Sequence, residues 1–130
     1  DSIFYCSSYV GHESLDFSMD VIDKAMEFYR NIFTDSGACF WRYPKTYPLN
    51  IHNQAQGIIT FSKSTNYTDK YKDFPSKIIQ YTNDNLLSKK QYYYYQKNRY
   101  IKNKIPYMRW SQSWMLISLC TYLEELNSKK

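Results

Sequence analysis

The pattern of hydrophobic and polar positions predicts four helices that occur as two pairs. Residues 14–33 carry apolar side chains at Ile22, Met26, Tyr29 and Phe33, which is the spacing of one helix face, with charged residues between them. The other three predicted helices span residues 53–63, 73–87 and 109–126. In the third, Asp73 stands at a capping position and Pro75 at a first-turn position. We therefore expect a mainly helical chain.

The last predicted helix differs from the others because apolar residues cover most of its circumference. A helix that is apolar on nearly every side is usually buried by several neighbours. We therefore expect residues 109–126 to lie inside the helical bundle. Its apolar residues are Trp110, Trp114, Met115, Leu116, Ile117, Leu119, Cys120, Tyr122, Leu123 and Leu126.

Short aromatic segments separate the two helices of each pair. Residues 39–43 follow a turn at Gly37, a residue that tolerates the left-handed conformation, and residues 92–95 are four consecutive tyrosines. Aromatic residues favour a pleated strand, in which Tyr92 and Tyr94 would share one face. Each helix pair is therefore predicted to carry a small β-hairpin at one end.

The same order of elements recurs in both halves, at residues 12–64 and 68–126. Each half places a proline, Pro48 or Pro106, shortly before a helix that contains a glutamine, and we take Gln56 and Gln112 as equivalent. The predicted fold class is all-α: two helix–β-hairpin–helix repeats within one domain that spans residues 1–130.

Composition supports a globular protein with large half-buried aromatic surfaces. Hydrophobic residues make up 43% of the chain and charged residues 22%, whereas aromatic residues reach 19% with fifteen tyrosines. The net charge of +5 is spread along the chain, which argues against nucleic acid as a partner. A remaining alternative is RNA binding through residues 92–104, where aromatic and basic residues alternate.

The number and spacing of the cysteines and the length of the apolar runs indicate the cellular compartment of the chain and the cofactors it could bind. Cys6, Cys39 and Cys120 are odd in number and far apart, which predicts free thiols in a reducing cytoplasm and no zinc site. No apolar run approaches the ~20 residues that cross a bilayer, and no signal peptide is visible. No phosphate loop or dinucleotide fingerprint is present, so we expect no cofactor. The cysteine spacing and the short apolar runs likewise lead us to expect no metal and no membrane partner.

Two segments carry a resemblance to a known family. Residues 47–60 (YPLNIHNQAQGIIT) and 104–114 (KIPYMRWSQSW) resemble the C-terminal repeats of bacterial proteins associated with capsular and surface polysaccharide assembly. Those proteins are similar to the six-hairpin glycosidase, or (α/α)6-toroid, superfamily. The resemblance covers residues 10–126 and implies a partial α/α toroid that handles carbohydrate. Relatives sometimes carry a δ-aminolevulinic acid dehydratase label, but this chain lacks the alternating βα pattern of that barrel enzyme.

His52 is the candidate catalytic residue, as a general base, and His12 is the only other histidine. The alternative is a neutral helix-end histidine bonded to backbone. The resemblance implies an acid before Ile51 and His52, but this chain has Asn50, and an amide cannot transfer the proton. The resemblance implies a relative of glycoside hydrolases, lyases or epimerases. Because of the amide at position 50, we expect no activity from this chain alone.

Glycan binding is predicted at the hairpin end of the helices. Aromatic faces stack on sugars, arginine reaches the carboxylates of acidic sugars, and amides bond sugar hydroxyls. The alternative for the amides is that they satisfy backbone groups of the neighbouring hairpin, and we expect this structural role for Gln56 and Gln112. Hydrolysis requires two carboxyl groups, but no acidic residue lies between Asp35 and Asp69. The predicted substrate-binding residues are Trp41, Arg42, Tyr43, His52, Gln54, Arg109 and Trp110.

Two functional hypotheses follow from these patterns. The first is a carbohydrate-binding or carbohydrate-processing segment of bacterial polysaccharide metabolism. The second is a non-catalytic interaction or scaffold module, because two repeats cannot close a toroid and leave apolar lateral faces open. The second hypothesis expects a homo-oligomer, or the remainder of a longer parent chain, on those faces.

Overall fold

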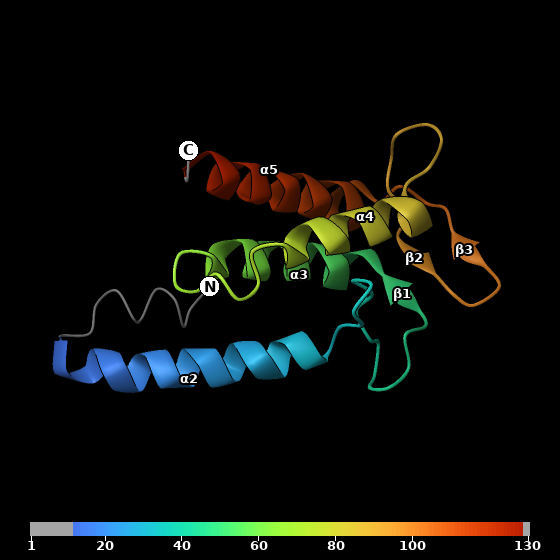
Figure 1. Ribbon diagram of the computed structural model, residues 1–130. Helices are drawn as coiled ribbons and strands as arrows, with labels where there is room; N and C mark the ends of the chain where they lie inside the picture. The colour runs from blue at the N-terminus through green and yellow to red at the C-terminus, as the bar shows by residue number, and fades with distance from the viewer. Residues whose placement is uncertain (1–11, 129–130) are drawn as a thin grey trace. The chain divides into compact units, whose positions relative to one another are not determined.

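The computed structural model describes residues 12–128, with side chains from Met19 onward. The chain separates into two compact units, Asp1–Ile32 and Phe33–Lys130, so the boundary falls inside the first predicted repeat, residues 12–64. The described elements, shown in Figure 1, are α2 (His12–Asn31), β1 (Leu49–Asn50), α3 (Ile51–Ser64), α4 (Phe74–Leu86), β2 (Gln96–Lys97), β3 (Lys102–Asn103), the π-helical turn η1 (Met108–Gln112) and α5 (Ser113–Ser128).

All four predicted helices are present, and their ends agree with the sequence pattern to within two residues. The last one begins with the π-helical turn η1, which the sequence pattern did not predict. The small antiparallel sheet means that the fold is mostly helical and not purely all-α, which corrects the predicted class.

The first unit is described by α2, a helix of 20 residues. Two of its charged residues form an exposed ion pair, in which Lys24 Nζ lies 2.6 Å from Asp20 Oδ2 one turn earlier. Exposed pairs of this spacing stabilise a helix by only a few tenths of a kcal/mol. The amphipathic pattern, more than the ion pair, accounts for this helix.

The second unit is built around α3, which packs against both α4 and α5. Phe33 and Phe74 each stack edge-on with Phe61 of α3, at ring-centroid distances of 5.6 and 4.8 Å. Gly57 lets the Phe33 ring approach the α3 backbone, since a β-carbon there would meet that ring. The fully buried apolar side chains of α3 and its neighbours are Leu49, Ile51, Ala55, Ile58, Phe61, Ile78, Leu86 and Met115.

Local capping explains where α3 and α4 begin. Asn50 Oδ1 accepts a hydrogen bond of 2.8 Å from the His52 amide, which satisfies one of the free N–H groups of the first turn of α3. Pro75 stands in the first turn of α4 as predicted. Asp73 occupies the capping position of α4, but its side chain makes no capping hydrogen bond.

A three-stranded antiparallel sheet lies at the end of the unit where α3 begins (Figure 1). Leu49 pairs with Lys97, and Gln96 pairs with Asn103, so the segment before α3 joins the segment between α4 and η1. The sheet therefore ties the N-terminal end of α3 to the connection that precedes α5.

The predicted strands at residues 39–43 and 92–95 are wrong. These segments contain only isolated bridges, among them Phe33 to Cys39 and Leu87 to Tyr93, and the paired strands begin just after the tyrosine run. The physical reason is that glutamine side chains, described below, take the backbone hydrogen bonds that a neighbouring strand would otherwise make. Tyr92 and Tyr94 do share a face, with ring centroids 5.6 Å apart.

The expectation that the last helix lies inside the bundle is also wrong. Within α5 only Met115 and Ser118 are buried, whereas the apolar side chains Leu116, Ile117, Leu123 and Leu126 are 46–64% exposed. Among the described helices α5 packs along α3 and its own leading turn η1. One neighbouring helix covers one stripe of α5, so the remaining apolar circumference stays open.

Candidate functional site

The loop after α2 is held by the amide of Gln54, a fully buried residue of α3. Cys39 N–H donates to Gln54 Oε1 at 2.7 Å, and Gln54 Nε2 donates to the Gly37 carbonyl at 2.9 Å and to Thr82 Oγ1 at 3.1 Å. Gly37 adopts a positive φ of 95°, which an L side chain rarely tolerates. The Gln54 amide is thus saturated by internal partners.

The loop after α4 uses a corresponding set of bonds. Tyr93 N–H donates to Gln112 Oε1 at 3.0 Å, and Gln112 Nε2 donates to the Tyr93 carbonyl at 2.7 Å. Gln91 is the residue of this loop with a positive φ, at 63°. Ser88 N–H donates to the Tyr92 carbonyl at 2.8 Å. In the loop after α2, Thr34 N–H donates to the Ala38 carbonyl at the same distance.

These bonds correct the expected role of Gln54 and the matching of the glutamines, while the structural role expected of Gln112 agrees with its bonds to the Tyr93 backbone. Gln54, not Gln56, corresponds to Gln112, because Gln56 Nε2 donates to Thr60 Oγ1 of its own helix at 3.2 Å. Gln54 was expected to contact a ligand, but its buried amide anchors a loop and faces no solvent. Buried polar groups need internal partners, and Gln54 supplies them to the loop backbone.

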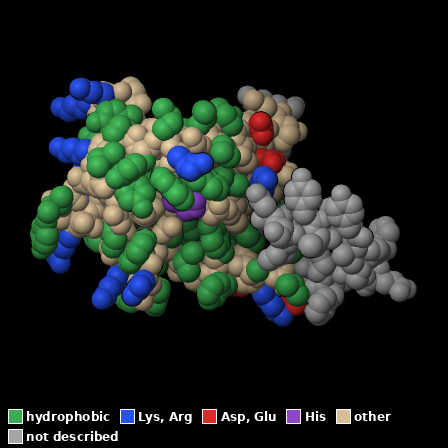
Figure 2. All heavy atoms as spheres, turned by 180° about the vertical axis from the view of Figure 1, so that it is seen from behind, with side chains coloured by type: hydrophobic (Ala, Val, Ile, Leu, Met, Phe, Trp, Pro, Cys, Tyr) green, Lys and Arg blue, Asp and Glu red, His purple; other side chains and the backbone are tan. Residues whose placement is uncertain are grey.

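His52 and two tryptophans form an aromatic cluster at the N-terminal end of α3, which we call the His52 cluster. The imidazole lies 4.4 Å from the Trp114 ring in an edge-on arrangement and 6.5 Å from the Trp110 ring. Trp110 is 54% exposed, whereas Trp114 and His52 are partly buried. Figure 2 shows this histidine surrounded by hydrophobic side chains on one face of the molecule.

The Nδ1 atom of His52 is buried and has no hydrogen-bond partner among the described residues. The alternative of a helix-end histidine bonded to backbone therefore finds no support at this atom. An imidazole that packs edge-on against an indole is positioned as part of a wall, and no carboxylate orients it as a catalytic base requires. His12 begins α2, and its side chain lies outside the described residues.

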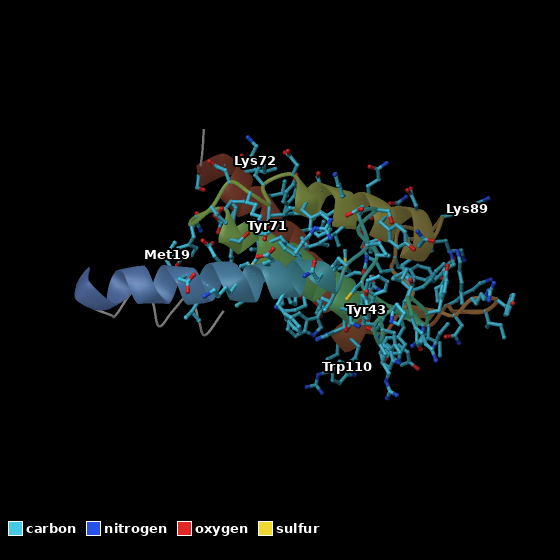
Figure 3. All side chains as sticks on the ribbon, turned by 60° about the horizontal axis from the view of Figure 1, so that its bottom comes forward. Met19, Tyr43, Tyr71, Lys72, Lys89 and Trp110 are labelled. Atoms are coloured by element: carbon cyan, nitrogen blue, oxygen red, sulfur yellow. The ribbon has the colours of Figure 1, made fainter. Side chains whose placement is uncertain are left out.

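The other predicted contacts lie on the exposed loop before β1. Trp41 N–H donates to the Lys45 carbonyl at 2.8 Å, which closes a tight turn around Arg42. Trp41 is 43% and Tyr43 77% exposed, and the Tyr43 ring stacks edge-on with Phe40 at 5.4 Å. In the view of Figure 3, Tyr43 and Trp110 lie toward one side of the unit and Tyr71 and Lys72 toward the other.

The structure thus brings together part of the predicted set. The ring contacts join His52 to Trp110, while Trp41, Arg42 and Tyr43 belong to a separate loop turn. Trp114 had been assigned to the core, yet it makes the closest ring contact to His52. The spacing of one helical turn between Trp110 and Trp114 was the available signal, because residues four apart share a helix face.

The chain segments that contain the His52 cluster are basic in sequence. Residues 36–68 and 85–123, which contain the loop turn, α3, the sheet, η1 and most of α5, hold ten Lys and Arg residues and no Asp or Glu. Arg109 is exposed and adjoins Trp110 in η1. Within residues 12–128, no group of three or more His, Cys, Asp or Glu side chains is placed to hold a metal ion.

The buried Cys39 and the half-buried Tyr93 both have a raised pKa. Burial raises the pKa of the Cys39 thiol from 9.0 to about 12, so this cysteine is protonated and a poor nucleophile at neutral pH. Burial also raises the pKa of Tyr93, whose hydroxyl donates to Asn83 Oδ1 at 2.8 Å. Neither group is therefore a candidate for covalent catalysis.

Comparison with known protein families, curated proteins and solved structures finds no match for this chain. In the part of the chain that the structure describes, no helix has the length and apolar character needed to cross a membrane.

Proposed function

We propose that this chain is a glycan-binding segment of a helical-repeat protein, with the His52 cluster as its binding surface. The observation that supports this most directly is the half-exposed Trp110 ring of η1, whose centroid lies 6.5 Å from that of the His52 ring. An aromatic ring held by neighbouring rings offers a flat surface for the C–H face of a sugar without a large loss of side-chain entropy. Arg109, one residue away, supplies a fork for a carboxylate.

The ligand class that we propose is an acidic polysaccharide, as in bacterial surface polysaccharide metabolism. The segments that contain the cluster carry ten Lys and Arg and no Asp or Glu, and such a charge balance attracts anionic chains. The same segments lack the pair of carboxyl groups that glycoside hydrolysis requires, so the proposed role is binding without cleavage by this chain alone.

We further propose that the segments around α3 and α5 are two repeats of a partial α/α toroid. Support comes from the matched loop bonds: Gln54 and Gln112 each hold the backbone of a preceding loop, and each loop has a positive-φ residue at the same place, Gly37 or Gln91. Repeats that share a side-chain anchor of this kind are expected to stack through equivalent helix faces.

The test of glycan binding is a titration with oligogalacturonate, followed by tryptophan fluorescence, with neutral maltohexaose as the control ligand. We expect Trp110→Ala and Arg109→Gln each to weaken oligogalacturonate binding about tenfold without lowering the melting temperature, because both side chains are exposed. Arg99→Gln, which removes an exposed arginine on the β2–β3 connection, is the matched control and should have little effect. Equal losses in Arg99→Gln and Arg109→Gln would show non-specific charge attraction and contradict the proposed site.

A second candidate function, protein association, is favoured by the open apolar stripe of α5. Leu116, Cys120 and Leu123 are exposed at the spacing of one helix face, next to Ile117. Contiguous apolar surface of this kind is typical of interfaces. We expect a concentration-dependent dimer by light scattering that Leu116→Glu abolishes, whereas a monomer at every concentration would contradict self-association.

A further inference from the structure

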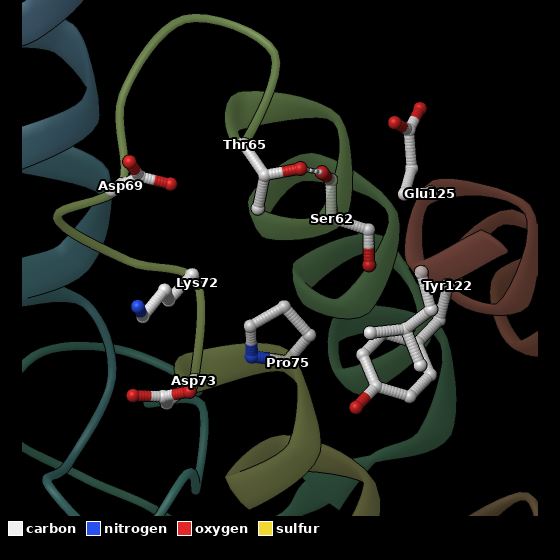
Figure 4. A pocket seen from close by; sticks show the side chains of 9 residues that line it. Ser62, Thr65, Asp69, Lys72, Asp73, Pro75, Tyr122 and Glu125 are labelled. Carbon is white, nitrogen blue, oxygen red and sulfur yellow. Dashed lines mark hydrogen bonds between the residues drawn. The ribbon is translucent and has the colours of Figure 1, made fainter. Parts of the chain in front are cut away.

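A pocket lies at the opposite end of α3 from the His52 cluster. Its volume is about 280 Å³, at the small end of the range for ligand sites. It is enclosed by the last turns of α3, the segment that leads into α4, and the C-terminal half of α5 (Figure 4). The lining residues are Ser62, Thr65, Asp69, Lys72, Asp73, Pro75, Tyr122, Glu125 and Leu126.

Ser62 lines this pocket with a hydroxyl that lacks a partner. The residue is 1% exposed, and its Oγ makes no hydrogen bond among the described residues. Other buried helical serines are satisfied, since Ser64 Oγ donates to the Phe61 carbonyl and Ser118 Oγ to the Met115 carbonyl, each at 2.8 Å. Figure 4 shows the Ser62 hydroxyl directed into the space beside Pro75 and Tyr122.

A buried hydroxyl without a hydrogen-bond partner is destabilising, so its retention indicates a partner that enters the pocket. The Ser62 oxygen has both of its lone pairs and its proton available, and can therefore accept from a ligand donor. Thr65 Oγ1 does not fill this role, because it donates to the Ser62 carbonyl at 2.7 Å. The partner is therefore a polar group on a ligand, and the charge of the lining decides whether that group donates or accepts.

The charge of the lining indicates the kind of ligand group. Residues 33–130 contain fifteen Lys and Arg but only six Asp and Glu, and three of those six acids, Asp69, Asp73 and Glu125, line this one pocket with a single lysine, Lys72. The pocket is thus acidic on a basic unit. Carboxylates around a small, partly enclosed space favour a cation over a neutral or anionic ligand.

The remaining wall of the pocket is apolar and aromatic. Pro75, Leu126 and the ring of Tyr122 line it, and an aromatic face attracts organic cations as well as apolar groups. We propose that this pocket binds a small organic ammonium, namely a primary amine on a short apolar or aromatic body. The ammonium donates to Ser62 Oγ, the exposed or half-exposed carboxylates of the lining attract its charge at longer range, and the body packs against Tyr122 and Pro75.

This site is separate from the proposed glycan surface. Ser62 lies ten residues beyond His52 in α3, which is roughly 15 Å along the helix at 1.5 Å per residue. One surface is basic and the other acidic, so their ligands carry opposite charge. A chain with both sites would bind an acidic glycan at one end of α3 and an amine at the other.

The test compares phenethylamine with 2-phenylethanol, which has a similar shape and no charge, by NMR titration of the intact chain. We expect the amine to shift resonances of the pocket residues and to bind at least tenfold more tightly than the alcohol. Raising the salt concentration from about 20 mM to about 500 mM should weaken amine binding, because the carboxylates are screened. Equal binding of amine and alcohol, or no shift at the pocket with millimolar amine, would overturn the proposal.

Variants separate the pocket from general charge effects. Glu125→Gln should weaken amine binding about threefold to tenfold, whereas Glu124→Gln, the same change on a neighbouring residue outside the lining, should leave it unchanged. Ser62→Ala should weaken amine binding and leave the melting temperature unchanged or raised, because the hydroxyl has no internal partner to lose. A lower melting temperature in Ser62→Ala, or equal losses in both Gln variants, would overturn the proposal.

Discussion

The side-chain amide of Gln112 bonds both polar groups of the Tyr93 backbone. Tyr93 N–H donates to Oε1 at 3.0 Å, and Nε2 donates to the Tyr93 carbonyl at 2.7 Å. Gln54 similarly accepts from Cys39 N–H and donates to the Gly37 carbonyl. In both places an amide carried by a helix takes the position that a neighbouring strand would occupy, so an aromatic loop is held in place without a sheet.

The two glutamine anchors should differ in their importance for stability. Gln54→Met keeps the bulk of the side chain but leaves two buried backbone groups unsatisfied, so we expect the free energy of unfolding to fall by about 2–4 kcal/mol. Gln112→Met acts at a partly buried site and should cost about 1–2 kcal/mol. Urea denaturation measures both. Gln56→Met is the control, and a loss there as large as in Gln54→Met would contradict the anchor role.

The positive-φ positions of the two loops should respond in opposite ways. Gly37→Ala places a β-carbon 2.8 Å from the Lys77 carbonyl oxygen at a φ of 95°, so we expect a loss of at least about 2 kcal/mol. Gln91→Gly relieves a side chain from a φ of 63° and should be neutral or stabilising by up to about 1 kcal/mol. Thermal denaturation of both variants checks this, and a tolerated Gly37→Ala would show that the loop is not held against α4.

Thiol labelling should distinguish two of the cysteines. Cys39 is buried with a pKa raised to about 12, whereas Cys120 is exposed. Because the thiolate is the reactive form, iodoacetamide at pH 8 should label Cys120 within minutes and leave Cys39 largely unmodified in the folded chain. Peptide mass spectrometry reads out each site, and labelling in urea is the control that should equalise them. Cys6 lies outside the described residues, so no labelling rate is predicted for the peptide that contains it.

Alkaline pH should destabilise the fold. Burial raises the pKa of Cys39 from 9.0 to about 12 and also raises that of Tyr93, and burial with the charge of Tyr47 raises that of Tyr81. The unfolded chain therefore loses these protons at lower pH than the folded chain, so the contribution is complete below pH 9 and is lost as the pH approaches 12. Urea midpoints measured from pH 8 to 11 should fall, and Cys39→Ala should flatten the decline. A midpoint that rises with pH would contradict the burial of these groups.

Local features of the sequence were sufficient to predict the helices. The apolar spacing in residues 14–33 and Pro75 at the start of α4 act within one or two turns, so a chain segment carries the information by itself. The tyrosine run 92–95 was misassigned for the opposite reason. Its β-propensity was real, but the partner that takes the backbone bonds of Tyr93 is a side chain nineteen residues away.

The prediction that α5 is buried on several sides was wrong. An apolar side chain is stabilised by a packed neighbour, but its presence in the sequence does not show that such a neighbour exists. Leu116 and Leu123 are as hydrophobic as Met115, yet only Met115 faces α3 closely enough to be buried. Which sides of a helix are covered depends on how many elements surround it, and the sequence of one helix does not encode that number. The open stripe of α5 is therefore a property of the assembled unit.

The sequence by itself determined the four helices, the turn at Gly37, the aromatic and basic character of the hairpin end, and its shortage of acids. Only the tertiary structure decided which of those residues meet: His52 with Trp114, Gln54 with Cys39, and Ser62 with the acidic pocket. Secondary structure follows from interactions over a few residues. A site requires groups from separate elements to converge, and their convergence is set by the packing of whole helices.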